Sequence, residues 1–324
     1  MPEVLLVVSI DTEEDNWSRS RDNVTLANIR ELRPQAALFK QLGVRPTYFT
    51  TYHVAVDHCA ADLLREVSED GRAEIAAHLH PWNTPPLTEA FVARNSMLKN
   101  LPAELQLEKL QRVTAALQEA FDLPPTAFRA GRYGLGRETV GALLRCGYQV
   151  DSSVSPFIDL RTTDDGPTFV GAPMTAYRLA PDRDVREPAP DGTLVEIPLS
   201  YGFNRGPFGF WDPVRRGLEA APLRWLHLAG IAARAGLLKR LILSPEIASV
   251  SEMLTLSRRL LEQGVRHLHL TWHSPTLKPG LSPFAATAAD VARVYRAVAG
   301  YVEGLSRLTP FRCATVSEAA ALLG

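Results

Sequence analysis

The chain is poor in cysteine and almost without net charge. Its 324 residues include three cysteines, which lie far apart and form no Cys-x-x-Cys pair: Cys59, Cys146 and Cys313. This usage is not that of a disulfide framework, and we expect three reduced, buried thiols in a cytoplasmic protein. The formal net charge is −1 and no long basic or acidic run occurs. The composition therefore indicates neither nucleic acid nor a charged membrane surface as a partner.

Long apolar runs and a leader segment are also missing. The longest apolar stretch after the first strand, residues 225–243, is interrupted by Arg234, Lys239 and Arg240, so we expect no membrane span. The N-terminus begins almost at once with an apolar run and lacks the three parts of a signal peptide, which favours a cytoplasmic location. No internal repeat or low-complexity tract interrupts the chain.

The first half of the chain alternates strand and helix patterns. Such alternation is typical of an α/β fold in which parallel strands are joined by helices that pack outside the sheet. Apolar and β-branched runs predict strands at Val4–Val8, Thr47–Thr51, Ala73–Ala77, Ala127–Ala130 and Tyr148–Val150. Helical spacing predicts helices at Val24–Leu42, Ala60–Val67, Leu105–Phe121 and Glu138–Cys146.

The pattern loosens after residue 156, where Pro, Asp and Gly are dense. We interpret residues 156–245 as an irregular insertion, or loops over the site, within one domain that spans residues 1–324. The insertion contains an expected strand at Thr193–Pro198. Further elements are predicted as helices at Pro222–Leu243, Val250–Gln263 and Pro283–Leu305, strands at Val265–Trp272 and Arg312–Thr315, and a C-terminal helix.

A cluster of carboxylates directly follows the first apolar run. Asp11, Glu13, Glu14 and Asp15 stand within five positions at the end of an expected buried strand. They would repel one another unless a metal, a proton or an arginine lay among them. In an extended backbone Asp11 and Glu13 point to the same side, so one could hold a metal while the other acts as a base. A solvated acidic loop is the alternative interpretation.

Two histidines end the third predicted strand. His78 and His80 are two residues apart, so an extended backbone points both imidazoles the same way, and they can share one metal. With a carboxylate they form a two-histidine, one-carboxylate set, which leaves coordination positions for water and substrate.

An arginine and a glycine-rich turn follow the fourth strand. A buried Arg129 needs a carboxylate partner, and Asp11 or Asp151 is the natural candidate. The glycines at positions 131, 134 and 136 lie between a strand and a helix, as in a dinucleotide-binding unit. Their spacing differs from Gly-x-Gly-x-x-Gly, so we regard this second interpretation as weak.

The strand at Val265–Trp272 delivers a third candidate histidine. His273 lies at its carboxyl end and is the expected catalytic residue, whereas His267 and His269 are expected to be hydrogen-bonded core histidines. Aromatic side chains that follow strand ends suit sugar rings, although core packing explains single aromatics equally well. The candidates for substrate binding are Trp82, Tyr133 and Trp272.

Five motifs occur in the order found in a known family: Ser9–Glu13, Glu74–His80, Phe128–Gly134, Gly147–Ser153 and Leu270–His273. In these motifs the chain resembles the polysaccharide deacetylases of the NodB-homology fold, and within them the WalW-type subgroup associated with bacterial surface-polysaccharide genes. The resemblance implies a distorted (β/α) barrel of seven or so parallel strands. It also implies metal-dependent removal of acetyl groups from sugars.

The resemblance assigns catalytic roles to four residues. Asp11 would be the general base, and Arg129 would hold and orient it. His273 would be the general acid, and Asp151 would support it.

The metal ligands depart from the family pattern at two places. Thr12 stands where the family has the second of two adjacent aspartates, so the carboxylate ligand must come from Glu13 or Glu14. His78 matches the first histidine ligand, and Trp82 stands at the place of the second. The resulting metal set is Glu13, His78 and His80, the last replacing the missing histidine from two residues along.

These observations predict a hydrolase acting on carbon–nitrogen bonds other than peptide bonds, in carbohydrate metabolism. We expect it to bind a divalent metal, zinc before nickel or cobalt, and to deacetylate an acetylated sugar, N-acetyl before O-acetyl. The substrate would be a surface-polysaccharide precursor, either sugar-lipid or nucleotide-sugar. The alternatives are an inactive carbohydrate-binding protein and another C–N hydrolase that acts on a small amide. The apolar residues 207–211 offer either a homodimer face or a lid.

Overall fold

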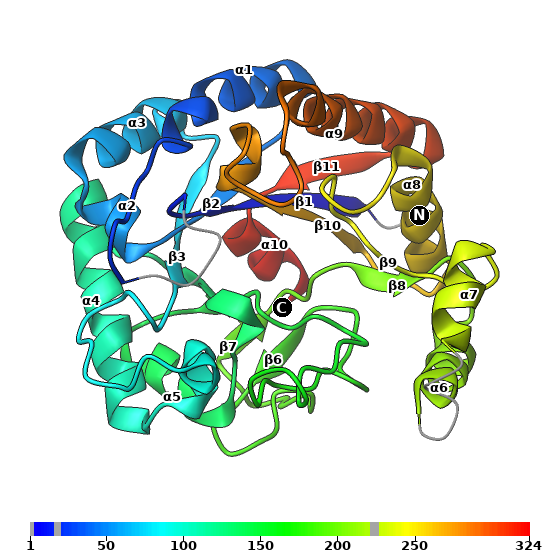
Figure 1. Cartoon of the computed structure of the whole chain (residues 1–324), viewed down its shortest axis with the longest axis horizontal. Helices are drawn as coiled ribbons and strands as arrows, with labels where there is room; N and C mark the ends of the chain where they lie inside the picture. The colour runs from blue at the N-terminus through cyan, green and yellow to red at the C-terminus, as the bar shows by residue number, and fades with distance from the viewer. Residues whose placement is uncertain (1–2, 16–20, 221–226) are drawn as a thin grey trace.

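A computed structural model of the chain describes residues 3–15, 21–220 and 227–324. Its main sheet has the strand order β10-β1-β2-β3-β4-β5-β7-β6, and neighbours from β10 to β7 pair in parallel while β6 is antiparallel to β7. The strands are β1 Val4–Thr12, β2 Pro46–Thr50, β3 Glu74–Leu79, β4 Ala127–Ala130, β5 Val150–Asp151, β6 Tyr177–Leu179, β7 Leu194–Glu196 and β10 His267–His273. The sheet curls into a half-barrel (Figure 1), which confirms the predicted α/β barrel class.

Helices surround the curled sheet, and one lies within its curve (Figure 1). The outer helices are α1 Leu32–Leu42, α2 Tyr52–Val56, α3 His58–Ser68, α4 Ala103–Phe121, α5 Arg137–Arg145, α8 Val250–Glu262 and α9 Ala288–Leu308. The last strand, β11 Phe311–Ala314, pairs with the first half of β1, and α10 Val316–Leu323 then enters the curve. None of the helices in the described part of the chain is long and apolar enough to cross a membrane.

Side-chain alternation along each strand separates two cores. In β1, Leu5 and Val7 point inward and pack with residues of α10, whereas Leu6, Val8 and Ile10 belong to the outer core beneath the helices. The inner core therefore fills the amino-terminal end of the half-barrel. The same alternation directs the odd-numbered Asp11 inward, at the open carboxyl-terminal end.

The expected insertion is more regular than its sequence suggests. Besides β6 and β7 it contains a second, antiparallel sheet of β8 Tyr201–Phe203 and β9 Arg240–Ile242, and the helices α6 Phe208–Glu219 and α7 Leu228–Arg234. The single helix predicted for residues 222–243 is wrong at its end, because the buried run 241–243 extends beside β8 instead. Residues 222–226 of that prediction lie outside the described residues.

Two smaller predictions also need correction. Helix α1 begins at Leu32, not Val24, and a short 3₁₀ turn at Ile29–Glu31 precedes it. All three cysteines are free, but Cys59 is exposed because it lies on the solvent side of the first turn of α3, and Cys146 and Cys313 are only half-buried. The predicted burial of the thiols was therefore wrong.

Candidate active site

A cavity of about 760 Å³ opens at the carboxyl ends of the strands, where the parallel topology brings distant motifs together. Its lining includes seven of the predicted site residues: Asp11, Glu13, His78, His80, Trp82, Tyr133 and His273. The register of the paired strands explains why these side chains lie together, because Asp11 of β1 lies opposite His273 of β10 and His78 of β3 lies opposite Arg129 of β4. The cavity is therefore the candidate active site.

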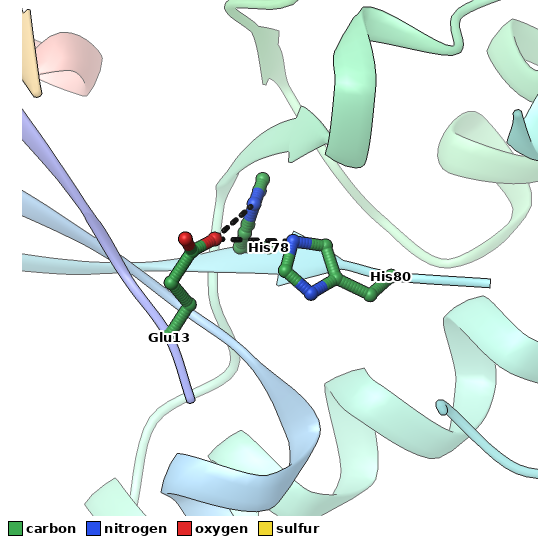
Figure 2. A group of neighbouring side chains, drawn as sticks. All are labelled: Glu13, His78 and His80. Carbon is green, nitrogen blue, oxygen red and sulfur yellow. Dashed lines mark ion pairs between the residues drawn. The ribbon is translucent and has the colours of Figure 1, made fainter. Parts of the chain in front are cut away.

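Three of these side chains form a group able to hold a metal ion. Glu13 Oε2 lies 3.1 Å from His80 Nε2 and 3.6 Å from His78 Nε2, and the three donor atoms lie within 4.8 Å of one another (Figure 2). Two imidazole nitrogens and one carboxylate oxygen are a donor set that suits zinc and other first-row divalent ions. The donor set fits a divalent cation. Of the two carboxylates left open by the sequence, Glu13 is the one that meets both histidines.

A hydrogen bond fixes the tautomer of His78, and carboxylates face both ring nitrogens of His80. His78 Nδ1 lies 2.9 Å from the carbonyl oxygen of Arg129, and a carbonyl can only accept, so Nδ1 carries the proton and Nε2 is free to bind metal. His80 Nδ1 lies 3.4 Å from Glu14 Oε1, which leaves His80 Nε2 directed at Glu13. Each imidazole is thus oriented by a hydrogen-bond partner at the ring nitrogen that does not face Glu13.

Glu14 is the buried support of His80. Its Oε2 accepts a hydrogen bond of 2.7 Å from Thr51 Oγ1, and its Oε1 accepts from Asn83 Nδ2 as well as facing His80. Burial would raise the pKa of Glu14, but the hydrogen bonds and charge of His80 and the Thr51 hydroxyl outweigh it and lower the pKa. Glu14 therefore stays ionised and acts through His80.

The glycine turn provides close packing around this centre. A Cβ at Gly131 would lie 2.6 Å from His80 Cδ2, so only glycine leaves room for the imidazole. A Cβ at Gly134 would lie 2.7 Å from the backbone nitrogen of Leu98, and one at Gly136 would lie 2.8 Å from Lys99 Cβ. Packing against His80 and the 98–99 segment accounts for these glycines without a bound dinucleotide.

Asp11 is held by Arg129 beside the metal group. Arg129 Nη1 donates to Asp11 Oδ1 at 2.5 Å, and Arg129 Nε donates to the carbonyl of Ser152 at 2.9 Å. The guanidinium is almost completely buried and lies over the ring of Phe49, 4.1 Å from its centroid. Burial would raise the pKa of Asp11, but Arg129, with His78 and His273, lowers it below the ordinary value. The carboxylate is therefore available as a base.

His273 faces Asp11 from the neighbouring strand β10. His273 Nε2 lies 3.9 Å from Asp11 Oδ2, and His273 Nδ1 lies 3.0 Å from Glu246 Oε2. Glu246 is buried, and its Oε1 also accepts from the backbone nitrogen of His273 at 3.1 Å and from Thr276. Burial would lower the pKa of His273, but Glu246, then Glu13 and Asp11, raise it to about 10. His273 is therefore protonated at neutral pH.

Asp151 does not occupy the supporting position predicted for it. Because Val150 points into the inner core, the next residue points to the outer face of the sheet, away from His273. There Asp151 accepts from Ser153 and faces Glu196 across the β5–β7 pair. Burial raises the pKa of Asp151, and burial together with the charge of Asp151 raises that of Glu196. One shared proton explains why Glu196 Oε2 has no donor among the described residues.

The predicted core histidines are confirmed. His267 and His269 are buried, with His267 Nε2 3.0 Å from the carbonyl of Pro198 and His269 Nε2 2.8 Å from Ser9 Oγ. Burial lowers the pKa of both imidazoles, so they are neutral. They lie below the cavity and support its floor.

The three predicted substrate-binding aromatics have different positions. Trp82 stacks on His80 with ring centroids 4.3 Å apart and planes at 16°, and Tyr133 lines the cavity. Trp272 is wrongly predicted, because it alternates with His273 and so points into the outer core, where it packs against Phe39. Tyr201 of β8, which the sequence did not single out, lines the cavity instead.

Glu246 is the main residue that sequence reasoning missed. Its signal is the buried run Leu241–Leu243 followed by Ser244-Pro245-Glu246, the same arrangement of apolar strand and polar end that marks the other site segments. The signal was hidden because the run was assigned to a helix.

A buried lysine holds the loop that follows His80. Lys109 Nζ donates to the carbonyls of Pro81, Thr84 and Pro86 at 2.6–2.9 Å and lies 3.1 Å from Glu89 Oε2. Its side chain is 0% exposed. One helix residue thus fixes the segment that carries Trp82 and Asn83.

Replacing this lysine should destabilise the protein. Lys109→Met leaves three buried carbonyls without their donor and takes one of its two cationic partners from Glu89, which keeps Arg21, so we expect a loss of roughly 3–5 kcal/mol in the free energy of unfolding. Urea denaturation measures it, with the exposed Lys40→Met as the matched control. Equal midpoints for the two variants would contradict the assigned role of Lys109.

Solved structures share this fold at low sequence identity. A Mycobacterium smegmatis protein assigned as a polysaccharide deacetylase superposes with a TM-score of 0.54 at 17% identity, over 99% of this chain and 91% of that one. A chitin deacetylase from the fungal pathogen Colletotrichum lindemuthianum gives 0.45 at 11%, over 98% and 90%. A CE4-family pseudoenzyme from Bacillus anthracis gives 0.45 at 8%, over 98% and 66%. No protein-family model and no curated protein matches the chain. The first of these likenesses establishes the fold, the half-barrel of NodB-like deacetylases.

Proposed function

We propose that the protein is a metal-dependent deacetylase that removes an acetyl group, N-acetyl before O-acetyl, from a sugar of a surface-polysaccharide precursor. The observation that carries the proposal is the placement of two groups of opposite protonation beside one metal-binding group. Asp11, with a lowered pKa, and His273, with a raised pKa, lie 3.9 Å apart next to Glu13, His78 and His80. A base and an acid separated in this way are what amide hydrolysis requires.

The chain's own groups would divide the reaction between them. A divalent cation held by Glu13, His78 and His80, zinc before nickel or cobalt, supplies Lewis-acid polarisation of a carbonyl and of a water. Asp11 takes a proton from the attacking water, and Arg129 keeps the Asp11 carboxylate ionised and oriented. His273 donates its Nε2 proton to the departing sugar nitrogen, so that acetate and a free amine result. Glu246 keeps His273 charged until that step.

Acetate release from N-acetylated sugars tests the proposal. The purified protein, loaded with zinc, should release one acetate for each free amine formed, and a chelator should stop the reaction. Equal release with and without chelator would exclude the metal-dependent mechanism. No release from any acetylated sugar, with about one zinc per chain, would favour the small-amide hydrolase. No release and no bound metal would favour the carbohydrate-binding protein.

The role of Glu246 predicts a change in pH dependence. In the wild type, activity is present below the pKa of the acid His273 and is lost as the pH rises through it. Glu246→Gln removes the negative charge that raises this pKa, so the alkaline limb of kcat/KM should move down by roughly one to three pH units. Glu252→Gln, remote from the cavity and paired with Lys239, is the control. If the alkaline limb of kcat/KM does not move in Glu246→Gln, His273 is not the general acid.

A further inference from the structure

Exposed apolar side chains gather at the mouth of the candidate active site. Phe91, Val92 and Ile247 are 52%, 53% and 59% exposed, and all three line the cavity. Eight large apolar side chains of the described residues are more than half exposed, and three of them border this one opening. We refer to these three residues as the apolar rim.

The rim is attached to anchored backbone. Phe91 and Val92 follow the loop held by Lys109 and Glu89, and the guanidinium of Arg21 lies 5.2 Å from the centre of the Phe91 ring. Ile247 follows Glu246, which is fixed on His273 and Thr276, and its backbone nitrogen donates to the carbonyl of Ser244. The rim is therefore a formed feature of the surface beside the reacting groups.

The chemistry of the rim distinguishes between the two precursor classes. Val92 and Ile247 are branched aliphatic chains with no hydrogen-bonding atom and no aromatic face, so they gain most from contact with hydrocarbon. Among the described residues that line the cavity, Arg132 is the one arginine or lysine, and it is paired with Asp164 at 2.6 Å. Arg132 is thus already paired within the protein, and the described lining offers no second arginine or lysine to the diphosphate of a nucleotide-sugar.

We propose that the apolar rim binds a hydrocarbon chain carried by the substrate, which is then an acetylated sugar of the glycolipid class. This inference rests on the proposed deacetylase function and specifies its substrate. The sugar of the substrate enters the polar cavity, and its hydrocarbon chain extends out of the cavity over Val92 and Ile247. Each methylene that the rim covers should favour binding by roughly fourfold.

A series of alkyl glycosides of N-acetylglucosamine tests the inference on the full-length, zinc-loaded protein. With methyl, hexyl and octyl glycosides below their micelle concentrations, kcat/KM for acetate release should rise roughly 10- to 100-fold from methyl to octyl. In the double variant Val92→Ser, Ile247→Ser this rise should be lost. Leu123→Ser should keep it, because Leu123 is 74% exposed but lines a different groove.

The possible results distinguish a failure of the glycolipid inference from a failure of the proposed deacetylase function. Hydrolysis of all members at one rate overturns the glycolipid inference and leaves the deacetylase intact. If no glycoside is hydrolysed, the proposed deacetylase function is overturned. Calorimetric measurement of the affinity for the same glycosides then tests whether the apolar rim binds hydrocarbon. Affinity that rises with chain length in the wild type and not in the double variant supports hydrocarbon binding, and affinity independent of length overturns it.

Discussion

Asp11→Asn should lower kcat by roughly 10²- to 10⁴-fold while the protein keeps its divalent cation. The amide cannot take the proton of the attacking water. It has nearly the shape of the carboxylate, and its oxygen can still accept from Arg129, so the cavity should keep its form. Glu13, His78 and His80, the groups expected to hold the cation, are untouched by the change. Acetate release and elemental analysis on the same preparation measure the two effects.

The segment itself offers a matched control. Asp15 is as buried as Asp11, but its oxygens accept from the backbone nitrogens of Ala27 and Asn28 and not from groups of the cavity. Asp15→Asn should therefore cost some stability and leave kcat close to the wild-type value. Turnover that survives in Asp11→Asn would assign the base to another group. Loss of the cation together with turnover would make Asp11 part of the metal site.

Residue alternation explains both the successes and the errors of sequence-based prediction. In β1 and β3 the strand is long and its inward face is known. The two-residue separation of Asp11 from Glu13, and of His78 from His80, was therefore enough to place both members of each pair in one cavity. Trp272 lies one residue from His273, so it lies on the opposite face of β10, in the outer core. Closeness in sequence to a strand end does not identify the face.

The partner of His273 could not be predicted because it comes from a distant loop. Glu246 lies 27 residues before His273 and reaches it only because the segment after β9 runs beside β10, where Thr271 N donates to the carbonyl of Leu243. Local patterns carry no information on that pairing. The fold was more accessible, since repeated strand–helix units permit few topologies.

His80→Ala should remove the bound cation and with it the activity. The ligand set depends on His80 because it is one of three residues in the metal-binding group, and the variant leaves only Glu13 and His78. We expect metal affinity to fall by at least about 100-fold, because losing a residue that binds the ion costs more than losing a hydrogen-bond partner of such a residue, which costs about 10- to 100-fold. Elemental analysis after dialysis should find about one zinc per chain in the wild type and none in the variant.

A second histidine variant keeps this prediction specific. His58 is exposed at the start of α3, far in sequence from the ligands, so His58→Ala should retain both metal and activity. A His80→Ala protein that folds and still holds one zinc would show that another group completes the site, with Glu14 the nearest candidate because it already contacts His80. Glu14→Gln in the His80→Ala background would then decide. Loss of zinc only in the double variant would identify Glu14 as the third ligand. Retention of zinc in the double variant would show that neither His80 nor Glu14 is needed to bind it.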